Sequence, residues 1–517
     1  MRRRTLLKGI GGTAVLLAAP RAWAQSDQGR WLRFESANFI YFSTADEAKA
    51  RTEVAALEGF HALLGRLMPR SQRSALKLTV YDTTTQRELE TASPGADEIV
   101  LGFYQPRIEH IRAVTSSRKD MERQRDVPRH ARAMDARTVL FHEYAHHHMR
   151  ANNRLAYPAW YTEGFAEFLS TVEFTDKGAD IGKVTVNRAT WIIHGDWLPI
   201  EPFLTKHPAQ LKSGKEVAQF YAQSWMAAHY LFSTPERARG FDKYTAALLQ
   251  GGDLLGAFEP AFGITPEQFD KELRDYKRKP IRFWTLGESK PDGSTIKVQR
   301  LGKSADELLL SMSFLRGLPP REEAKDAIAR VLGEAKKRPS DLYALQCKAL
   351  SEVWYGDLAE ARTQLDALLP LDASNAEVHH LSGLCDLRAG RKLGDEALLQ
   401  KAQNAFGRAH QLDDTRPQTM YRYVESGLAL TGMDDQLLDV LVGAYLLAPQ
   451  VDPIALTTAQ ALIERGRHDE AIAVLRPLTA EFHGDGMARL ARELTDTALA
   501  KEQTRFSFFG AAVMDDE

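Results

Sequence analysis

The chain has 517 residues, of which 44% are hydrophobic and 26% charged, a composition that argues against a disordered chain and against an integral membrane protein. Its length favours two to four domains. The formal net charge is −2, and without residues 1–24, which hold five basic and no acidic residues, it becomes −7. This balance gives no electrostatic case for nucleic acid or for anionic membrane surfaces as partners.

Residues 1–24 have the pattern of a secretory signal peptide. A basic start precedes a short apolar run at 10–19 and the cleavage motif Ala22-Trp23-Ala24, and Arg3-Arg4 resembles a twin-arginine signal. The apolar run is too short to span a bilayer comfortably. We expect a periplasmic or otherwise exported protein with no membrane span in the mature chain. A plain Sec signal and an uncleaved anchor are the alternatives.

The next hundred residues indicate mixed α/β structure. Apolar and β-branched residues predict strands over 38–43, 75–83 and 98–106, and apolar spacing of helical period predicts a helix over 46–68. The charge-rich run 118–132 is expected to be a solvated loop, with a flap over a cleft as the alternative.

A histidine-rich helix is predicted over 135–152, with Asp135 as its N-cap. His142 and His146 are four residues apart, so they lie on one face of the helix and can bind one Zn²⁺. Glu143 is placed beside such an ion, where a carboxylate can take a proton from a bound water. His147 and His148 do not fit this geometry, and we expect them to flank the site.

A third ligand is expected from the next predicted helix, 158–172. Glu163 lies there among aromatic residues, where an unpaired carboxylate is costly and a metal ion would account for it. Glu167, one turn further on, can accept a hydrogen bond from a ligand histidine and orient it.

These residues resemble the gluzincin metallopeptidases, in particular the peptidase MA-like branch. The match consists of His142-Glu143-x-x-His146 and Pro158-x-Trp160-x-x-Glu163-Gly164-x-Ala166-Glu167, within about residues 30–280. The resemblance implies one zinc ion held by His142, His146 and Glu163, with Glu143 as general base and acid. The metzincin pattern does not fit, because the sequence after the motif lacks that group's Gly and third His.

Gluzincins commonly use a downstream Tyr or His to stabilise the oxyanion, and the segment 220–232 resembles their downstream helix. Tyr221 is the first candidate, followed by His229 and Tyr230, with core packing as the alternative for each. A sheet edge near 98–106 could pair with an extended peptide. The isolated histidines His110, His130 and His194 are expected on the surface or in loops.

From residue 304 the sequence changes to paired helices with a spacing of about 34 residues, which resembles tetratricopeptide repeats. A generic array of α-hairpins is the alternative. Gly356, Gly390 and Gly466 are expected in the turns. The two cysteines, Cys347 and Cys385, are expected as buried thiols, with a disulfide as the less favoured alternative.

The predicted fold class is α+β. A small N-terminal mixed sheet and a helical zincin-like catalytic domain (25–280, after the signal peptide 1–24) are followed by a linker (281–303), an all-α tetratricopeptide-like solenoid (304–503) and a C-terminal tail (504–517). The predicted function is an exported zinc peptidase whose repeats dock a peptide or protein substrate or a protein partner. The alternatives are a non-catalytic periplasmic scaffold that binds partners through its repeats and a zinc hydrolase acting on a non-peptide amide.

Overall fold

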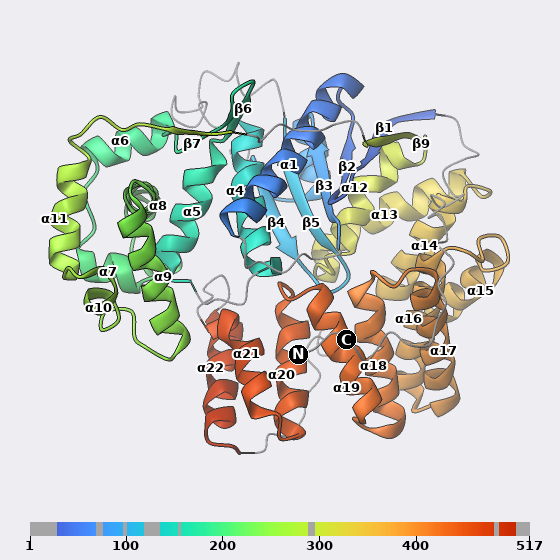
Figure 1. Ribbon diagram of the computed structural model, residues 1–517. Coiled ribbons are helices and arrows are strands. Elements are labelled where there is room, and N and C mark those ends of the chain that lie inside the picture. Colours follow the sequence, from blue (N-terminus) through green and yellow to red (C-terminus); the bar gives the residue numbers. More distant parts are fainter. Residues whose placement is uncertain are drawn as a thin grey trace.

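A mixed sheet lies at the centre of the N-terminal part of the protein (Figure 1). The computed structural model describes residues 28–68, 76–96, 101–117, 135–152, 157–287, 295–479 and 485–502. Within these residues the sheet has six strands in the order β4-β5-β3-β2-β1-β9. Their bounds are β1 (Gln28–Glu35), β2 (Phe39–Ser43), β3 (Leu78–Thr83), β4 (Gly102–Pro106), β5 (Ile111–Ser116) and β9 (Lys297–Gly302).

The order of the strands makes β4 an edge of this sheet. The pairs β2–β3 and β3–β5 are parallel, and β4 runs antiparallel to β5. The three strands predicted from the sequence are therefore present as β2, β3 and β4. The predicted signal peptide, the run 118–132 with His130, and the tail 504–517 lie outside the described residues.

Both faces of the sheet are buried. Successive side chains of a strand point to opposite faces, and the central strands carry apolar residues on each face. In β2, Phe39 and Tyr41 belong to one hydrophobic core, while Phe42 belongs to a second core on the opposite face. Helices α1 (Glu47–Leu67) and α4 (Ala136–Asn152) cover the first face. Helices α2 (Gln86–Ala92) and α12 (Ala305–Leu315) cover the second.

A mostly helical region follows α4 and lies beside it (Figure 1). Its aromatic residues extend the first core, and a small sheet β6-β7-β8 borders it. The elements are α5 (Ala159–Ser170), β6 (Glu173–Thr175), β7 (Gly178–Ile181), α6 (Val186–His194), α7 (Ile200–Thr205), the 3₁₀ helix η3 (Pro208–Gln210), α8 (Gly214–Phe232), α9 (Pro235–Leu249), α10 (Phe258–Phe262), α11 (Pro266–Tyr276) and β8 (Trp284–Leu286).

The segment 281–303, predicted as a linker from its Pro, Gly and Ser content, contains two strands instead. Strand β8 pairs with β7, and β9 pairs with β1 at the edge of the central sheet. Alternation explains β9, since Val298 packs against the first core while Leu301 is buried in the second. The sheet therefore includes a strand from the far side of the predicted domain boundary.

The C-terminal helical region, residues 305–499, consists of helices that pack each against the next in sequence. Alternate helices α12, α14, α16 and α18 also touch, which is the arrangement of stacked helix hairpins. After α12 the bounds are α13 (Arg321–Lys337), α14 (Leu342–Tyr355), α15 (Leu358–Leu368), α16 (Ala376–Leu393), α17 (Glu396–Leu412), α18 (Pro417–Thr431), α19 (Asp435–Leu447), α20 (Asp452–Glu464), α21 (His468–Thr479) and α22 (Asp485–Leu499).

This region confirms some of the predictions made from the sequence and corrects others. Gly356 and Gly466 lie in turns, but Gly390 lies inside α16, which ends instead at Gly394 in the left-handed conformation. Cys347 and Cys385 are free and buried, so the disulfide alternative is wrong. Across the described residues, every helix is too short or too polar to cross a membrane.

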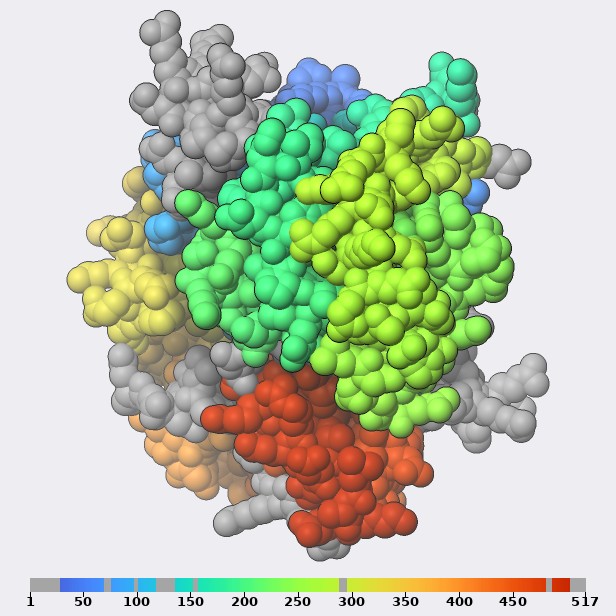
Figure 2. All heavy atoms as spheres, turned by 90° about the vertical axis from the view of Figure 1, so that its left-hand side faces the viewer, coloured from blue at the N-terminus to red at the C-terminus, as the bar shows by residue number. Residues whose placement is uncertain are grey.

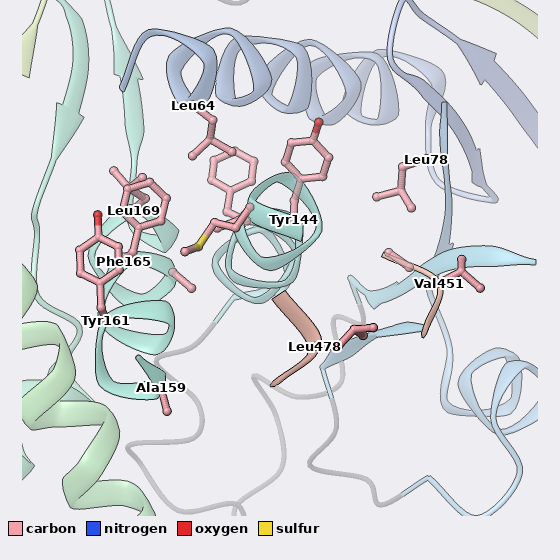
Figure 3. Packing of buried hydrophobic residues seen from close by; sticks show 14 of the residues in the cluster. Leu64, Leu78, Tyr144, Ala159, Tyr161, Phe165, Leu169, Val451 and Leu478 are labelled. Carbon is pink, nitrogen blue, oxygen red and sulfur yellow. The ribbon is translucent and has the colours of Figure 1, made fainter. Parts of the chain in front are cut away.

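The end of the C-terminal helical region shares a core with the sheet region. Figure 3 shows Leu478 below helix α4 and Val451 below Leu78 of β3, while Tyr144 of α4 points up to helix α1. Figure 2 shows the last helices, in red, beneath the green helices of residues 186–276. The described parts thus form one packed molecule around the sheet.

Candidate metal centre

Helix α4 carries the histidine pair, and the predicted cap is present. The Asp135 side chain accepts the backbone N–H of Thr138 at 2.7 Å, which satisfies one of the unpaired donors of the first turn. His142 and His146 follow on one face, with their Nε2 atoms 3.1 Å apart. Two imidazole nitrogens therefore converge on one point, as the i, i+4 spacing predicts.

Helix α5 brings Glu163 to the same point. Its Oε2 lies 3.4 Å from Nε2 of His142 and 3.3 Å from Nε2 of His146. Ligand atoms at about 2.0–2.1 Å from a tetrahedral zinc ion are about 3.3–3.4 Å from one another. The three side chains thus have the spacing of three corners of a zinc tetrahedron, which leaves the fourth corner for water or substrate.

The environment of Glu163 also fits a bound cation. The residue is 3% exposed, and within the described part of the chain its Oε2 has no hydrogen-bond partner. Burial alone would raise the pKa of Glu163, but His146 and His142 lower it well below the usual value. Burial would lower the pKa of His142, yet Glu163 and Glu167 raise it to about 9. The buried carboxylates thus favour a positive charge at the point where the three side chains converge.

Glu167 lies behind His142 and is itself held by an arginine. Its Oε1 is 3.4 Å from Nδ1 of His142, on the side of the ring opposite to the converging Nε2. Arg188 donates to both carboxylate oxygens, from Nε at 2.7 Å and from NH2 at 2.5 Å. This fork fixes the plane of the Glu167 carboxylate toward the imidazole.

Arg188 is a site residue that sequence reasoning missed. It lies in α6, whose N-cap Thr185 accepts the backbone N–H of Arg188 itself. The signal in the sequence is weak. A buried Glu167 needs a positively charged partner, and both Lys183 and Arg188 follow it closely in the sequence. Lys183 pairs with Glu173 and Asp180 instead.

Of the three oxyanion candidates, Tyr221 lies beside the histidine pair. Its ring centroid is 6.2 Å from that of His142, and the Arg188 guanidinium lies 5.1 Å from the Tyr221 ring centre. Burial, followed by the charges of Glu163 and Glu167, raises the pKa of Tyr221, so its hydroxyl stays a hydrogen-bond donor.

The other two candidates have partners elsewhere. Nδ1 of His229 is 3.0 Å from the Tyr276 hydroxyl, and its Nε2 is 2.9 Å from the Arg282 carbonyl. The Tyr230 hydroxyl donates to Glu272.

Glu143 is partly exposed on α4. Its charge contributes to the raised pKa of both His142 and Tyr221, as expected for a carboxylate near these two residues. Partial exposure leaves this carboxylate, next in sequence to His142, open to water.

His147 and His148 are buried and lie apart from the converging ligands. Nδ1 of His147 is 2.9 Å from the hydroxyl of Tyr104 in β4, and the His148 ring lies edge-on to His61. Burial lowers the pKa of each to about 3, so both stay neutral. Among the described residues, the side chains placed to hold a metal ion are His142, His146 and Glu163.

The remaining isolated histidines differ from each other. His194 is exposed, as expected. His110 lies in the loop between β4 and β5, also as expected, with its Nε2 3.1 Å from the hydroxyl of Tyr81 in β3.

Comparison with known proteins assigns no family. No family model matches the chain, and neither does any curated protein. Among solved structures, the crystal structure of MamA aligns with 35% of this chain and 90% of its own length, at 16% identity and a TM-score of 0.24.

Proposed function

We infer that the protein is a zinc-dependent peptidase of the gluzincin type, exported through its signal peptide. The observation that carries this proposal is the convergence of His142, His146 and Glu163 at zinc-ligand spacing, with Glu143 beside them. A purely structural zinc site is usually closed by four protein ligands, whereas three ligands and an adjacent carboxylate are typical of catalysis.

Each residue of the site has a separate role in the proposed reaction. Zinc at this site would lower the pKa of a bound water and polarise a carbonyl. Glu143 takes the proton of the attacking water and passes it to the leaving amine. Tyr221 donates a hydrogen bond to the oxygen on which negative charge develops. Glu167, held by Arg188, keeps the Nε2 of His142 directed toward the ligand cluster.

A peptide substrate is favoured by the edge strand β4. Its residues are partly exposed, and the described chain supplies a pairing strand, β5, on one side. An extended peptide can add to such an edge through main-chain hydrogen bonds. Because β4 packs against α4, a peptide added to this edge would run alongside the helix that carries His142 and His146.

The test combines metal analysis with cleavage of a peptide library. We expect about one zinc per chain in the wild type and cleaved peptides by mass spectrometry. Glu143→Gln should keep the zinc and lose hydrolysis by about 10³-fold or more, since the proton acceptor is removed and the ligands stay. Glu201→Gln, an exposed glutamate in α7, is the matched control and should leave both unchanged.

Two results would contradict the proposal. Full activity in metal-free protein would exclude a zinc mechanism. Zinc-loaded protein that cleaves no peptide, together with capture of a partner by the C-terminal helical region, would favour the scaffold alternative.

A further inference from the structure

The turn that joins β4 to β5 reaches into the C-terminal helical region. Glu109 in this turn is 7% exposed. Its Oε1 accepts from Nε of Arg422 in α18 at 2.8 Å, and its Oε2 lies 3.0 Å from Nε2 of His380 in α16. Figure 1 shows the lower ends of β4 and β5 directed toward these helices.

The groups that receive Glu109 are themselves held in place. Arg422 is 1% exposed and donates from NH1 to Glu425 at 2.6 Å, and His380 is bonded to Thr419. The cavity beside Glu109 has a volume of about 10 Å³, which is room for about one water molecule. The turn therefore already fills this charged pocket.

A second contact joins the same strands to the helices. Arg112 of β5 donates from NH1 to the Ser313 hydroxyl of α12 at 2.7 Å. The same guanidinium donates to Gln105 of β4 at 3.0 and 2.8 Å. One buried side chain thus links both strands to the first helix of the C-terminal region.

On its other side, β4 contacts the helix of the metal centre. The hydroxyl of Tyr104 is 2.9 Å from His147, the neighbour of His146. Strand β4 is therefore held between α4 on one side and the C-terminal helices, through Glu109 and Arg112, on the other.

We propose that the C-terminal helical region binds the β4–β5 turn of its own chain, with Glu109 as the recognised carboxylate, and so positions the edge strand against α4. Glu109 and Arg112 are positioning residues in this arrangement. This pocket is then no docking site for a separate partner. The effect on substrate binding rests on the proposed function, whereas the effect on β4 itself does not.

Hydrogen–deuterium exchange on the full-length protein tests the positioning directly. Glu109→Gln removes the charge from the turn, so backbone amides of 101–117 should exchange about 10-fold faster or more. The matched control is Glu334→Gln, a buried carboxylate of α13 that pairs with Lys337 and Arg338. It should leave exchange in 101–117 within about twofold of the wild type.

Unchanged exchange in 101–117 of a folded Glu109→Gln protein would overturn the proposal. If that variant fails to fold, Ser313→Ala removes the milder contact and should accelerate exchange in the same segment to a smaller extent. Unchanged exchange in Ser313→Ala would then overturn it.

A kinetic measurement tests the consequence for substrate. In Glu109→Gln the KM for a peptide of about eight residues should rise several-fold while zinc content stays constant, because β4 no longer presents a fixed edge. If the wild type cleaves no peptide, the proposed function fails, and the exchange measurement alone decides whether the turn is held.

Discussion

Glu163 and Glu167 lie one turn apart on α5, both are buried, and each meets a different positive group. Glu163 faces the two histidine Nε2 atoms, while Glu167 faces Arg188 and the far side of His142. Buried carboxylates are retained only with such partners, since desolvation of an unpaired charge is costly. The pair therefore separates into a ligand and the group that orients a ligand.

This division predicts the effect of removing the arginine. Arg188→Ala should weaken zinc binding roughly 10- to 100-fold, because Glu167 loses the fork that directs it toward His142. Arg188→Lys should recover only part of the affinity, since an ammonium keeps the charge but not the bidentate geometry. Affinity is measured by competition with a chelator of known affinity.

Lys183→Ala is the control for this measurement. Lys183 is a neighbouring cation that pairs with Glu173 and Asp180, and its loss should leave zinc affinity unchanged. Equal affinity of Arg188→Ala and the wild type would show that the orientation of Glu167 does not depend on the arginine.

At the scale of elements, the position of Glu163 depends on the close approach of α5 to α8. A Cβ at Gly164 would lie 2.3 Å from the carbonyl oxygen of Ser224 in α8. Only glycine allows this distance, so the residue after the ligand sets how near the two helices come.

Gly164→Ala should therefore separate α5 from α8, lower the free energy of unfolding by about 1–3 kcal/mol and weaken zinc binding. Denaturant unfolding and zinc titration measure the two effects. Gly65→Ala, in α1 with open space around its Cβ, should be neutral or stabilise by about 0.5–1 kcal/mol. A Gly164→Ala protein as stable as the wild type would contradict the packing argument.

At the scale of the whole molecule, the predicted boundary at residue 280 cuts through the central sheet. A chain that ends there lacks β9, the partner of β1, and lacks α12, which covers the second face. The exposed edge and the uncovered face, with Trp31 and Phe42, favour aggregation.

We expect such a truncated chain to be insoluble or to unfold without a cooperative transition. Soluble yield and thermal unfolding measure this. A soluble 25–280 chain with a sharp transition would show that the first domain folds without the C-terminal helices.

The contact between Glu109 and the C-terminal helices also predicts a pH dependence. Burial alone would raise the pKa of Glu109, but Arg422 and His380 lower it to about 2 from an ordinary 4.5. Because the pKa is lowered on folding, the ionised form stabilises the folded state above about pH 4.5, and this stabilisation is lost as pH falls toward 2. Its size is on the order of 3 kcal/mol.

Unfolding free energies of the wild type and Glu109→Gln should therefore differ most near pH 6 and converge as pH falls toward 2. A difference between the two proteins that stays constant over this range would show that ionisation of Glu109 does not stabilise the contact.

The sequence by itself was enough for the parts that depend on local spacing. The i, i+4 geometry of a helix places His142 and His146 together, and a short connection brings Glu163 on the next helix against them. Alternation along the chain likewise predicted β2, β3 and β4, because a strand exposes its two faces in turn.

Only the tertiary structure decided the contacts between distant segments. Any of 67 Lys and Arg residues could meet Glu167 or Glu109, and no local pattern selects Arg188 or Arg422. The same holds for β9, which pairs with β1 across about half the length of the chain although its sequence has linker composition. Such partners are selected by the packing of the whole chain, which stabilises a buried charge or a strand edge only when everything between them is folded.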